Sequence, residues 1–265
     1  MREFDAQLTL LDSAQVFHWV KTRTGYAALV NGRVMTDRDE TEEARVYFDD
    51  GRDYSRLMNA CEGIPMARRA LETLPGLRVL NQPAWEALLA FILSANNNVK
   101  RITNLVHSLC ECYGETMTYE GVQLYGFPSP ERLAKADETE MRERTRCGYR
   151  AKYLIETARR VADGFDLEGL RQKDTEEARR QLMTLPGVGG KVADCVLLFG
   201  LGHADAFPVD VWVERLMRDW FKVQGTRESM RKAAREILGA ECGLIQQWLF
   251  HAARTGAIEV CKTDK

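Results

Sequence analysis

The spacing of hydrophobic and polar positions changes near residue 82. Before this point, β-branched and aromatic residues mix in short segments typical of strands, over residues 6–11, 16–21, 24–36 and 43–50. The Asn31-Gly32 pair lies between two apolar runs and strongly indicates a β-hairpin. Two helices and an apolar segment are expected next, over residues 54–60, 66–73 and 77–82. The pattern predicts an N-terminal antiparallel β domain with linking helices over residues 1–82.

Helical periodicity dominates from Pro83 onward, and proline is common at the first position of a helix. Helices are expected over residues 83–93, 99–112, 150–163, 175–184, 191–200, 211–220, 227–238 and 244–254. We therefore predict an all-helical domain over residues 83–265. The fold class that follows is α+β, with the antiparallel β domain packed on the helical domain.

Composition limits the classes of protein that the chain can represent. Its 265 residues are 45% hydrophobic and 29% charged, which suits a soluble globular protein with two domains. The longest apolar runs, such as the one around residues 196–200, are too short to cross a membrane. The acidic N-terminal segment does not resemble a signal peptide. Seven cysteines without paired spacing indicate reduced thiols, so a cytoplasmic protein without membrane contact is expected.

The net charge of −2 does not by itself indicate a protein that binds nucleic acid. Affinity for phosphate depends on where basic residues gather rather than on the total charge. Residues 142–152 are locally basic, whereas residues 37–43 are acidic. The composition therefore permits a DNA-binding face on a mildly acidic protein.

The most informative segment is a glycine-rich turn between two predicted helices, within a helix-hairpin-helix over about residues 176–200. Its sequence is LPGVGGK, from Leu185 to Lys191. Gly187, Gly189 and Gly190 permit positive φ and leave backbone N–H groups uncovered at the start of a helix. Such a group of donors, together with the positive end of the helix dipole, suits a phosphate. A tight turn with no ligand is the more common fate of such a sequence.

A lysine and an aspartate follow this turn at helix starts. Lys191 begins the second helix, where the helix dipole favours a neutral amine over an ammonium, and a neutral amine is a nucleophile. Asp210 follows Pro208 and Val209 at the expected N-cap of the next helix. Taken singly, a surface lysine and an ordinary capping aspartate are the common interpretations.

The segment LPGVGGKVADC, followed by FPVDV, resembles the helix-hairpin-helix/Gly-Pro/Asp (HhH-GPD) superfamily of DNA glycosylases. The lysine is typical of its bifunctional branch, and within that branch the chain most resembles the 8-oxoguanine DNA glycosylase/lyases. The resemblance covers nearly the whole chain and includes the segments SANNNVKRIT, CGYRAKY and CGLIQQWLF, in the expected order. It implies a TBP-like N-terminal antiparallel domain and a partner of damaged double-stranded DNA.

The resemblance also implies a mechanism. The family's lysine, here Lys191, attacks C1′ of the damaged nucleotide, expels the base and forms a Schiff base, and β-elimination then cuts the strand. Asp210 stabilises positive charge that develops on the sugar and orients the lysine. No metal or redox cofactor is expected. Members of the superfamily with an iron–sulfur cluster carry four closely spaced cysteines near the C-terminus, where this chain has Cys242 and Cys261.

Four residues match the family's pocket for the extruded base. Phe250 and Cys195 sandwich the base in the family, and Gln246 bonds its Watson–Crick edge. Ala14 takes the place of a glycine whose carbonyl accepts the N7–H of 8-oxoguanine, and this carbonyl role requires a compatible backbone conformation. Core packing is the common alternative for Phe250 and Cys195, whereas a buried amide such as Gln246 needs partners.

Four further residues match those that fill the gap in the duplex and hold the orphaned cytosine: Asn96, Arg101, Tyr149 and Arg150. A tyrosine offers a stacking surface, and arginines can donate to the cytosine acceptors O2 and N3. Helix capping by Asn96 and a solvated basic loop are the alternative. Trp212 departs from the eukaryotic pattern, which has a histidine two residues after the aspartate.

Two other functions stay open. An alkylpurine glycosylase that activates water would share the aspartate and the hairpin; Lys191 argues against it, and Trp19, Trp212 and Trp248 would suit its aromatic pocket. A non-catalytic helix-hairpin-helix module would use the turn for phosphate contacts alone. The favoured hypothesis is a small prokaryotic-type enzyme, monomeric and nucleoid-associated, that removes 8-oxoguanine opposite cytosine.

Overall fold

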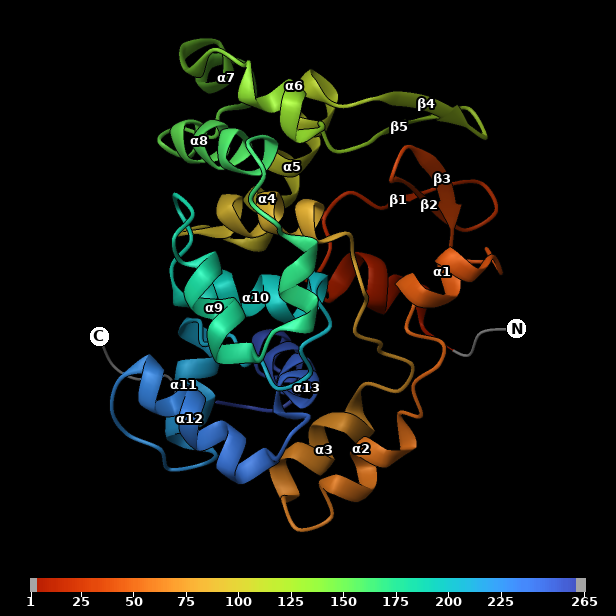
Figure 1. Ribbon diagram of the computed structural model, residues 1–265. Coiled ribbons are helices and arrows are strands. Elements are labelled where there is room, and N and C mark those ends of the chain that lie inside the picture. The colour runs from red at the N-terminus through yellow and green to blue at the C-terminus, as the bar shows by residue number, and fades with distance from the viewer. Residues whose placement is uncertain (1–3, 261–265) are drawn as a thin grey trace.

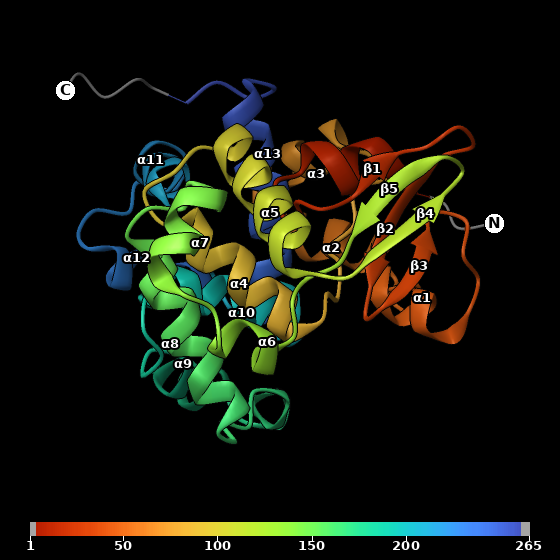
Figure 2. The same cartoon turned by 90° about the horizontal axis from the view of Figure 1, so that it is seen from above.

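The computed structural model describes residues 4–260 and begins with a small sheet flanked by short helices (Figures 1 and 2). The elements of this part are a π-helix η1 Leu8–Asp12, strands β1 Val20–Lys21, β2 Tyr26–Val30 and β3 Arg33–Thr36, and helices α1 Glu42–Tyr47, α2 Ser55–Ala60 and α3 Pro65–Thr73. The strands are antiparallel in the order β1-β2-β3. Asn31 and Gly32 both have positive φ, 48° and 73°, as a two-residue hairpin turn needs. The predicted hairpin is confirmed.

Two of the four predicted strands are wrong, because local capping favours helix there. Residues 6–12 form a helical segment that includes η1, and the carboxylate of Asp5 accepts the N–H of Leu8 at 2.8 Å. Residues 42–47 form α1, where the Thr41 hydroxyl accepts the N–H of Ala44 and two glutamates occupy the first turn. The mixed apolar and aromatic composition of both segments is compatible with either structure, and the caps decide between them.

The second part is mainly helical. Its helices are α4 Ala84–Ser94, α5 Val99–Tyr113, α6 Pro130–Ala134, α7 Glu138–Thr145, α8 Arg150–Ala162, η2 Glu168–Gln172, α9 Thr175–Leu182, α10 Gly190–Gly200, α11 Val211–Asp219, α12 Arg227–Leu238 and α13 Cys242–Thr255. All eight helices predicted beyond residue 82 form, and with the N-terminal sheet they confirm the α+β class. The short helices α6, α7 and η2 were not predicted.

A second hairpin interrupts the helical part and was also not predicted. Strands β4 Thr116–Tyr119 and β5 Val122–Tyr125 pair around Glu120 and Gly121, which both have positive φ. The hairpin lies against β2 (Figure 2), and Leu124 is buried with Ala27 and Leu29. The N-terminal sheet and the helical part therefore share a small apolar core. The domain boundary at residue 82 stays a prediction.

The main core lies around α4 and α10, which pack against each other, while α13 packs against α3 and α11 (Figure 1). Trp19 and Trp248 are both 3% exposed, and their indole N–H groups donate to the Tyr47 hydroxyl and to the Leu74 carbonyl. Both tryptophans are therefore part of the buried core. Between residues 4 and 260, no helix has the length and apolarity of a membrane span. The six cysteines of that range form no disulfide, and Cys261 lies outside it.

Two buried ionisable groups face each other where the sheet meets α4. The Nε2 atom of His18 lies 3.7 Å from Oε2 of Glu86, and both side chains are at most 6% exposed. Burial lowers the pKa of His18 to about 3, with a smaller contribution from His107. Burial also raises the pKa of Glu86 to about 8, against the effect of the Asn31 N–H that its carboxyl accepts. This pair is therefore uncharged near neutral pH.

Candidate active site

The glycine-rich turn between α9 and α10 is shaped by its neighbours. Gly187 has φ 78°, and a Cβ there would lie 2.8 Å from the Tyr153 side chain, so both conformation and space require glycine. The Thr157 hydroxyl donates to the Pro186 carbonyl at 3.0 Å and ties the turn to α8. Gly189 is the N-cap of α10 and has open space around it. The N–H groups at this helix start are accordingly uncovered, as phosphate binding requires.

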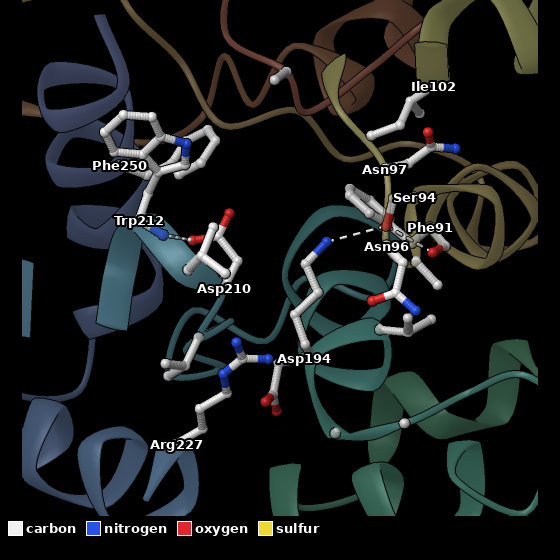
Figure 3. A pocket seen from close by; sticks show the side chains of 18 of the residues that line it. Phe91, Ser94, Asn96, Asn97, Ile102, Asp194, Asp210, Trp212, Arg227 and Phe250 are labelled. Carbon is white, nitrogen blue, oxygen red and sulfur yellow. Dashed lines mark hydrogen bonds between the residues drawn. The ribbon is translucent and has the colours of Figure 1, made fainter. Parts of the chain in front are cut away.

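Lys191 lies in the first turn of α10 and points into a pocket of about 1070 Å³. Its Nζ donates to the Ser94 hydroxyl at 3.1 Å, the bond that a dashed line marks in Figure 3. The same nitrogen lies 5.2 Å from the centre of the Phe91 ring. Ser94 is in turn oriented by donating to the Phe91 carbonyl at 2.7 Å. The end of α4 therefore holds the amine in place within the pocket.

Asp210 lies across the pocket from Ser94 (Figure 3) and is the N-cap of α11. Its Oδ1 accepts the N–H groups of Trp212 and Val213, both at 2.9 Å. These two bonds fix the carboxylate and place it among the residues that line the pocket with Lys191. The sequence interpretation of Asp210 as a cap is confirmed, and the cap faces the same space as the lysine.

The four residues assigned to the damaged base are divided between the pocket surface and its supporting helices. Ala14 and Phe250 line the pocket with Lys191. Ala14 has φ 60°, the left-handed conformation that a glycine would adopt without strain. Cys195 is buried on α10, and burial raises the pKa of its thiol to about 12, although the nearby Lys191 acts to lower it. Gln246 is 4% exposed on α13, and its Oε1 has no hydrogen-bond partner among residues 4–260.

The four residues assigned to the gap in the duplex lie at or next to the ends of α4, α5 and α8. Asn96 follows α4, lines the pocket and has φ 51°. Arg101 is exposed in the first turn of α5, and Tyr149 is 46% exposed before α8. Arg150 is only 4% exposed and donates to the carbonyls of Ala95, Asn96 and Cys147. Its guanidinium lies 4.5 Å from the Tyr149 ring centre.

Sequence reasoning missed two features of the site. Ser94, which bonds the lysine, gives no signal in an apolar helix. Asp194 lines the pocket and is 2% exposed, and its Oδ1 accepts from Arg179 Nε at 2.8 Å. A carboxylate within the otherwise apolar segment VADCVLLFG needs a buried partner, and that requirement could have indicated an ion pair. Within residues 4–260, no group of three His, Cys, Asp or Glu residues could hold a metal ion.

A glycine-rich helix-hairpin-helix that presents a lysine, with a capping aspartate across the pocket, defines a class of DNA-repair proteins. Residues 89–240 match the family described as HhH-GPD superfamily base excision DNA repair protein. The match covers more than half of the 265-residue chain, and the chain belongs to this family.

Curated relatives include N-glycosylase/DNA lyases from two organisms. The N-glycosylase/DNA lyase of Saccharomyces cerevisiae is 39% identical over 170 residues, which cover 59% of this chain and 45% of the yeast protein. The probable N-glycosylase/DNA lyase of Methanothermobacter thermautotrophicus is 33% identical over 210 residues, or 71% of this chain and 67% of the relative. The chain thus matches less than half of the length of the yeast protein.

The chain is also similar to a solved structure of an enzyme of the same kind. The structure is that of the Clostridium acetobutylicum 8-oxoguanine glycosylase/lyase in complex with double-stranded DNA containing cytosine opposite to 8-oxoG. This structure is 30% identical to the chain, covers 97% of it and 94% of the Clostridium chain, and has a TM-score of 0.89. The chain is therefore similar in nearly its whole fold to a glycosylase/lyase bound to DNA.

Proposed function

We propose that the protein is a base-excision DNA glycosylase with lyase activity that removes 8-oxoguanine, preferentially opposite cytosine. The observation that carries the proposal is the position of the Lys191 amine, which lies in the same pocket as Asp210 at the start of the hairpin's second helix. The family and the similarity to N-glycosylase/DNA lyases support it.

The chemistry follows from a primary amine beside a carboxylate. The lone pair of Lys191 Nζ forms a bond to C1′, and the C1′–N9 bond breaks with its electron pair going to the departing purine, which takes up a proton. The Nζ–C1′ adduct gives up a proton to O4′ as the C1′–O4′ bond breaks, which opens the sugar and leaves a protonated Schiff base and a 4′ hydroxyl. Loss of a C2′ proton then expels the 3′ phosphate. Asp210 stabilises positive charge on the sugar during the first step.

The extruded base is proposed to lie between Phe250 and the Cys195 side of α10. The unpartnered Oε1 of Gln246 is a buried acceptor, and a buried polar atom without a partner indicates a ligand or a water. The Watson–Crick edge of a purine provides matching donors. The carbonyl of Ala14, held at positive φ, is proposed to accept the N7–H that distinguishes 8-oxoguanine from guanine.

The gap in the duplex is proposed to be filled from the Asn96 and Tyr149 side. Tyr149 is exposed and can stack in the gap, while Arg101 is exposed and can reach the orphaned cytosine. Arg150 is proposed to have two roles in filling the gap. It donates to backbone carbonyls of the Asn96 turn and so supports that turn, and it makes the contact with cytosine that the resemblance implies. The N–H groups near Gly187, Gly189 and Gly190 are proposed to bind phosphate.

The alternative functions fit the site less well. An alkylpurine glycosylase has no use for an amine in the pocket, and Trp19 and Trp248 serve the core, so Trp212 alone of the three candidates lines the pocket. A non-catalytic module needs neither the pocket nor Asp210. We further propose that the protein acts as a monomer on chromosomal DNA in the cytoplasm of a prokaryotic-type cell.

One experiment separates the three functions. The protein is incubated, with and without borohydride, with duplexes that carry 8-oxoguanine opposite cytosine and with duplexes that carry an alkylated purine. A glycosylase/lyase is expected to release the base, cut the strand and form a reduced covalent adduct. Base release without adduct would indicate activation of water, and binding without either product would indicate a non-catalytic module.

A further inference from the structure

A second carboxylate lies next to Lys191 and is turned away from it. Asp194 is three residues further along α10, so the two side chains share a face of the helix. Both line the same pocket. In Figure 3 the Asp194 carboxylate points away from Ser94 and from Asp210. Helix geometry alone would allow a lysine and an aspartate with this spacing to pair.

The group that holds Asp194 in this direction is Arg179, from the helix before the hairpin. Its Nε donates to Asp194 Oδ1 at 2.8 Å, and its Nη2 lies 3.1 Å from Glu228 Oε2 on α12. A Cβ added to Gly190 would lie 2.3 Å from the same Nη2. The guanidinium therefore contacts the residue before Lys191 and the carboxylate one turn after it.

Arg179 is itself kept in place by a chain of ion pairs. Glu228 bonds Arg231 at 2.8 Å, and Arg231 makes two bonds to Glu176, at 2.7 and 2.9 Å. This network joins α9, α10 and α12. Arg179 is consequently fixed before any DNA arrives, and an arginine suits this place because its planar fork can bond two carboxylates at once.

We propose that Arg179 is a positioning residue that keeps the Asp194 carboxylate away from Lys191, so that Asp210 is the carboxylate that serves the amine. The inference rests on the proposed function. A buried carboxylate that loses its partner must find another cation or take up a proton. Lys191 is the cation on the same helix face. An ion pair with Asp194 would hold the lysine as an ammonium, which has no lone pair for attack on C1′.

Charged and titratable groups from three helices surround Asp194. Arg179 faces it from α9, Glu228 and Arg231 from α12, and Lys191 and Cys195 lie on its own helix, with Asp210 at the start of α11. Burial raises the pKa of Asp194 to about 7, while Arg179 and Arg231 act to lower it. Without Arg179, Arg231 still acts on Asp194 from α12, and Lys191 is the cation that lies on the same helix as Asp194.

The test is R179Q, assayed by single-turnover excision at saturating 8-oxoguanine duplex from pH 5.5 to 9. An anion beside the lysine stabilises its ammonium, so the acid limb of the rate profile should move up by about one pH unit, the lower end of the usual effect of one close charge. The rate at pH 7 should fall about tenfold or more. R179Q/D194N removes the competing carboxylate and should return both the rate and the profile to within about threefold of wild type.

The matched control is R180Q, which removes the exposed arginine next along α9 and should leave rate and profile unchanged. Equal losses in R179Q and R179Q/D194N, with no pH shift, would mean that Arg179 merely holds the hairpin together, and the proposal would fail. A wild-type profile in R179Q would also overturn it. Thermal unfolding of each variant separates these results from loss of fold.

Should R179Q not fold, R179K takes its place. The ammonium keeps the charge but can make only a point contact with Asp194, so a smaller shift in the same direction is expected, again cancelled by D194N. An unshifted R179K profile would then count against the proposal. Failure of the proposed function is a different result, because the wild-type protein would itself yield no borohydride adduct on the damaged duplex.

Discussion

The two sides of the pocket hold their functional groups by different means. The hairpin side, defined as residues 187–194 with Asp210, is shaped by glycine packing, a helix cap and the Arg179–Asp194 ion pair, and its lysine donates across the pocket to Ser94. The wedge side, defined as residues 94–101 with residues 147–150, is tied together by one arginine that bonds three backbone carbonyls.

The difference indicates a division of labour. On the proposed mechanism the hairpin side carries the groups that react, and fixed positions suit chemistry at a single atom. On the wedge side, Tyr149 and Arg101 stay exposed above a braced turn, which suits contact with a duplex of variable sequence. Substitutions on the hairpin side should therefore abolish reaction, and those on the wedge side should change which opposite base is accepted.

The largest effect is expected for Lys191→Gln. The amide keeps most of the length of the side chain but has no nucleophilic lone pair, so strand cleavage and the borohydride adduct should both disappear. Binding of the damaged duplex, measured by fluorescence anisotropy, should change by less than about fivefold, because phosphate contacts come from the backbone. A variant that still forms the adduct at the normal rate would place the nucleophile elsewhere.

The second-largest effect is expected for Asp210→Asn. The amide oxygen can still accept the N–H groups of Trp212 and Val213, so the cap should survive while the charge is lost. Single-turnover excision should slow by about a hundredfold or more, as removal of a group that stabilises transition-state charge does. Turnover at the wild-type rate would remove Asp210 from the mechanism.

Arg101→Ala tests the wedge side. The free-energy preference for cytosine over adenine opposite 8-oxoguanine, calculated from the ratio of the two activities, should fall by roughly 1–3 kcal/mol, the worth of one good bidentate base contact. Lys100→Ala removes the exposed cation beside it and should weaken activity against both duplexes equally. If Arg101→Ala behaved like Lys100→Ala, Arg101 would be a phosphate contact.

The sequence predicted the hairpin side far better than its surroundings. Gly187, Lys191 and Asp210 act through backbone conformation and helix ends, which are local properties that spacing along the chain can show. Every long helix after residue 82 was predicted because each buries one periodic face. The local features that place the proposed nucleophile and its carboxylate thus lie within about twenty-five residues.

Features set by distant contacts could not be predicted in this way. The ion pair of Arg179 with Asp194 and the bond from Lys191 to Ser94 join separate helices. Arg150 matched a cytosine-reading position, yet its burial and its three carbonyl partners depend on the Asn96 turn 54 residues away. Residues 6–11 and 43–50 were misjudged because a cap, rather than composition, decides their structure.

The pH profiles of the variants must be corrected for the pH dependence of the unfolding free energy. The buried His18–Glu86 pair predicts how this free energy changes with pH. Folding lowers the pKa of His18 from its ordinary value of 6.5, so below pH 6.5 the folded state binds fewer protons at His18 than the unfolded state does. Folding raises the pKa of Glu86 from its ordinary value of 4.5, so above pH 4.5 the folded state binds more protons at Glu86. Between about pH 4.5 and 6.5 these two residues change the unfolding free energy with pH in opposite directions, so their effects cancel. From pH 6.5 to the folded pKa of Glu86, about 8, only the Glu86 effect remains, and stability should fall.

The expected loss over that interval is roughly 2 kcal/mol, since one pKa unit corresponds to about 1.4 kcal/mol. Urea unfolding at pH 6.5 and 8 measures it. Glu86→Gln cannot ionise and should lack this loss, so the unfolding free energy of wild type minus that of the variant should decrease as pH rises. A gap that is constant over the interval would mean that Glu86 is already ionised at pH 6.5.

The smallest effect is expected for Ala14→Gly, and it tests whether the pocket uses the Ala14 carbonyl or its side chain. The left-handed conformation costs an L-residue about 1–2 kcal/mol, whereas glycine adopts it freely but loses about 0.4–1 kcal/mol through a more flexible unfolded chain. The unfolding free energy should therefore rise by about 0.5 kcal/mol. The carbonyl stays in place, so excision of 8-oxoguanine should remain within about twofold of wild type. Ala14→Val is the matched control, because a β-branched residue resists this conformation and should lower both stability and excision. If excision instead fell in the glycine variant while its stability rose, the Ala14 methyl group, and not the carbonyl, would be the part that contacts the base.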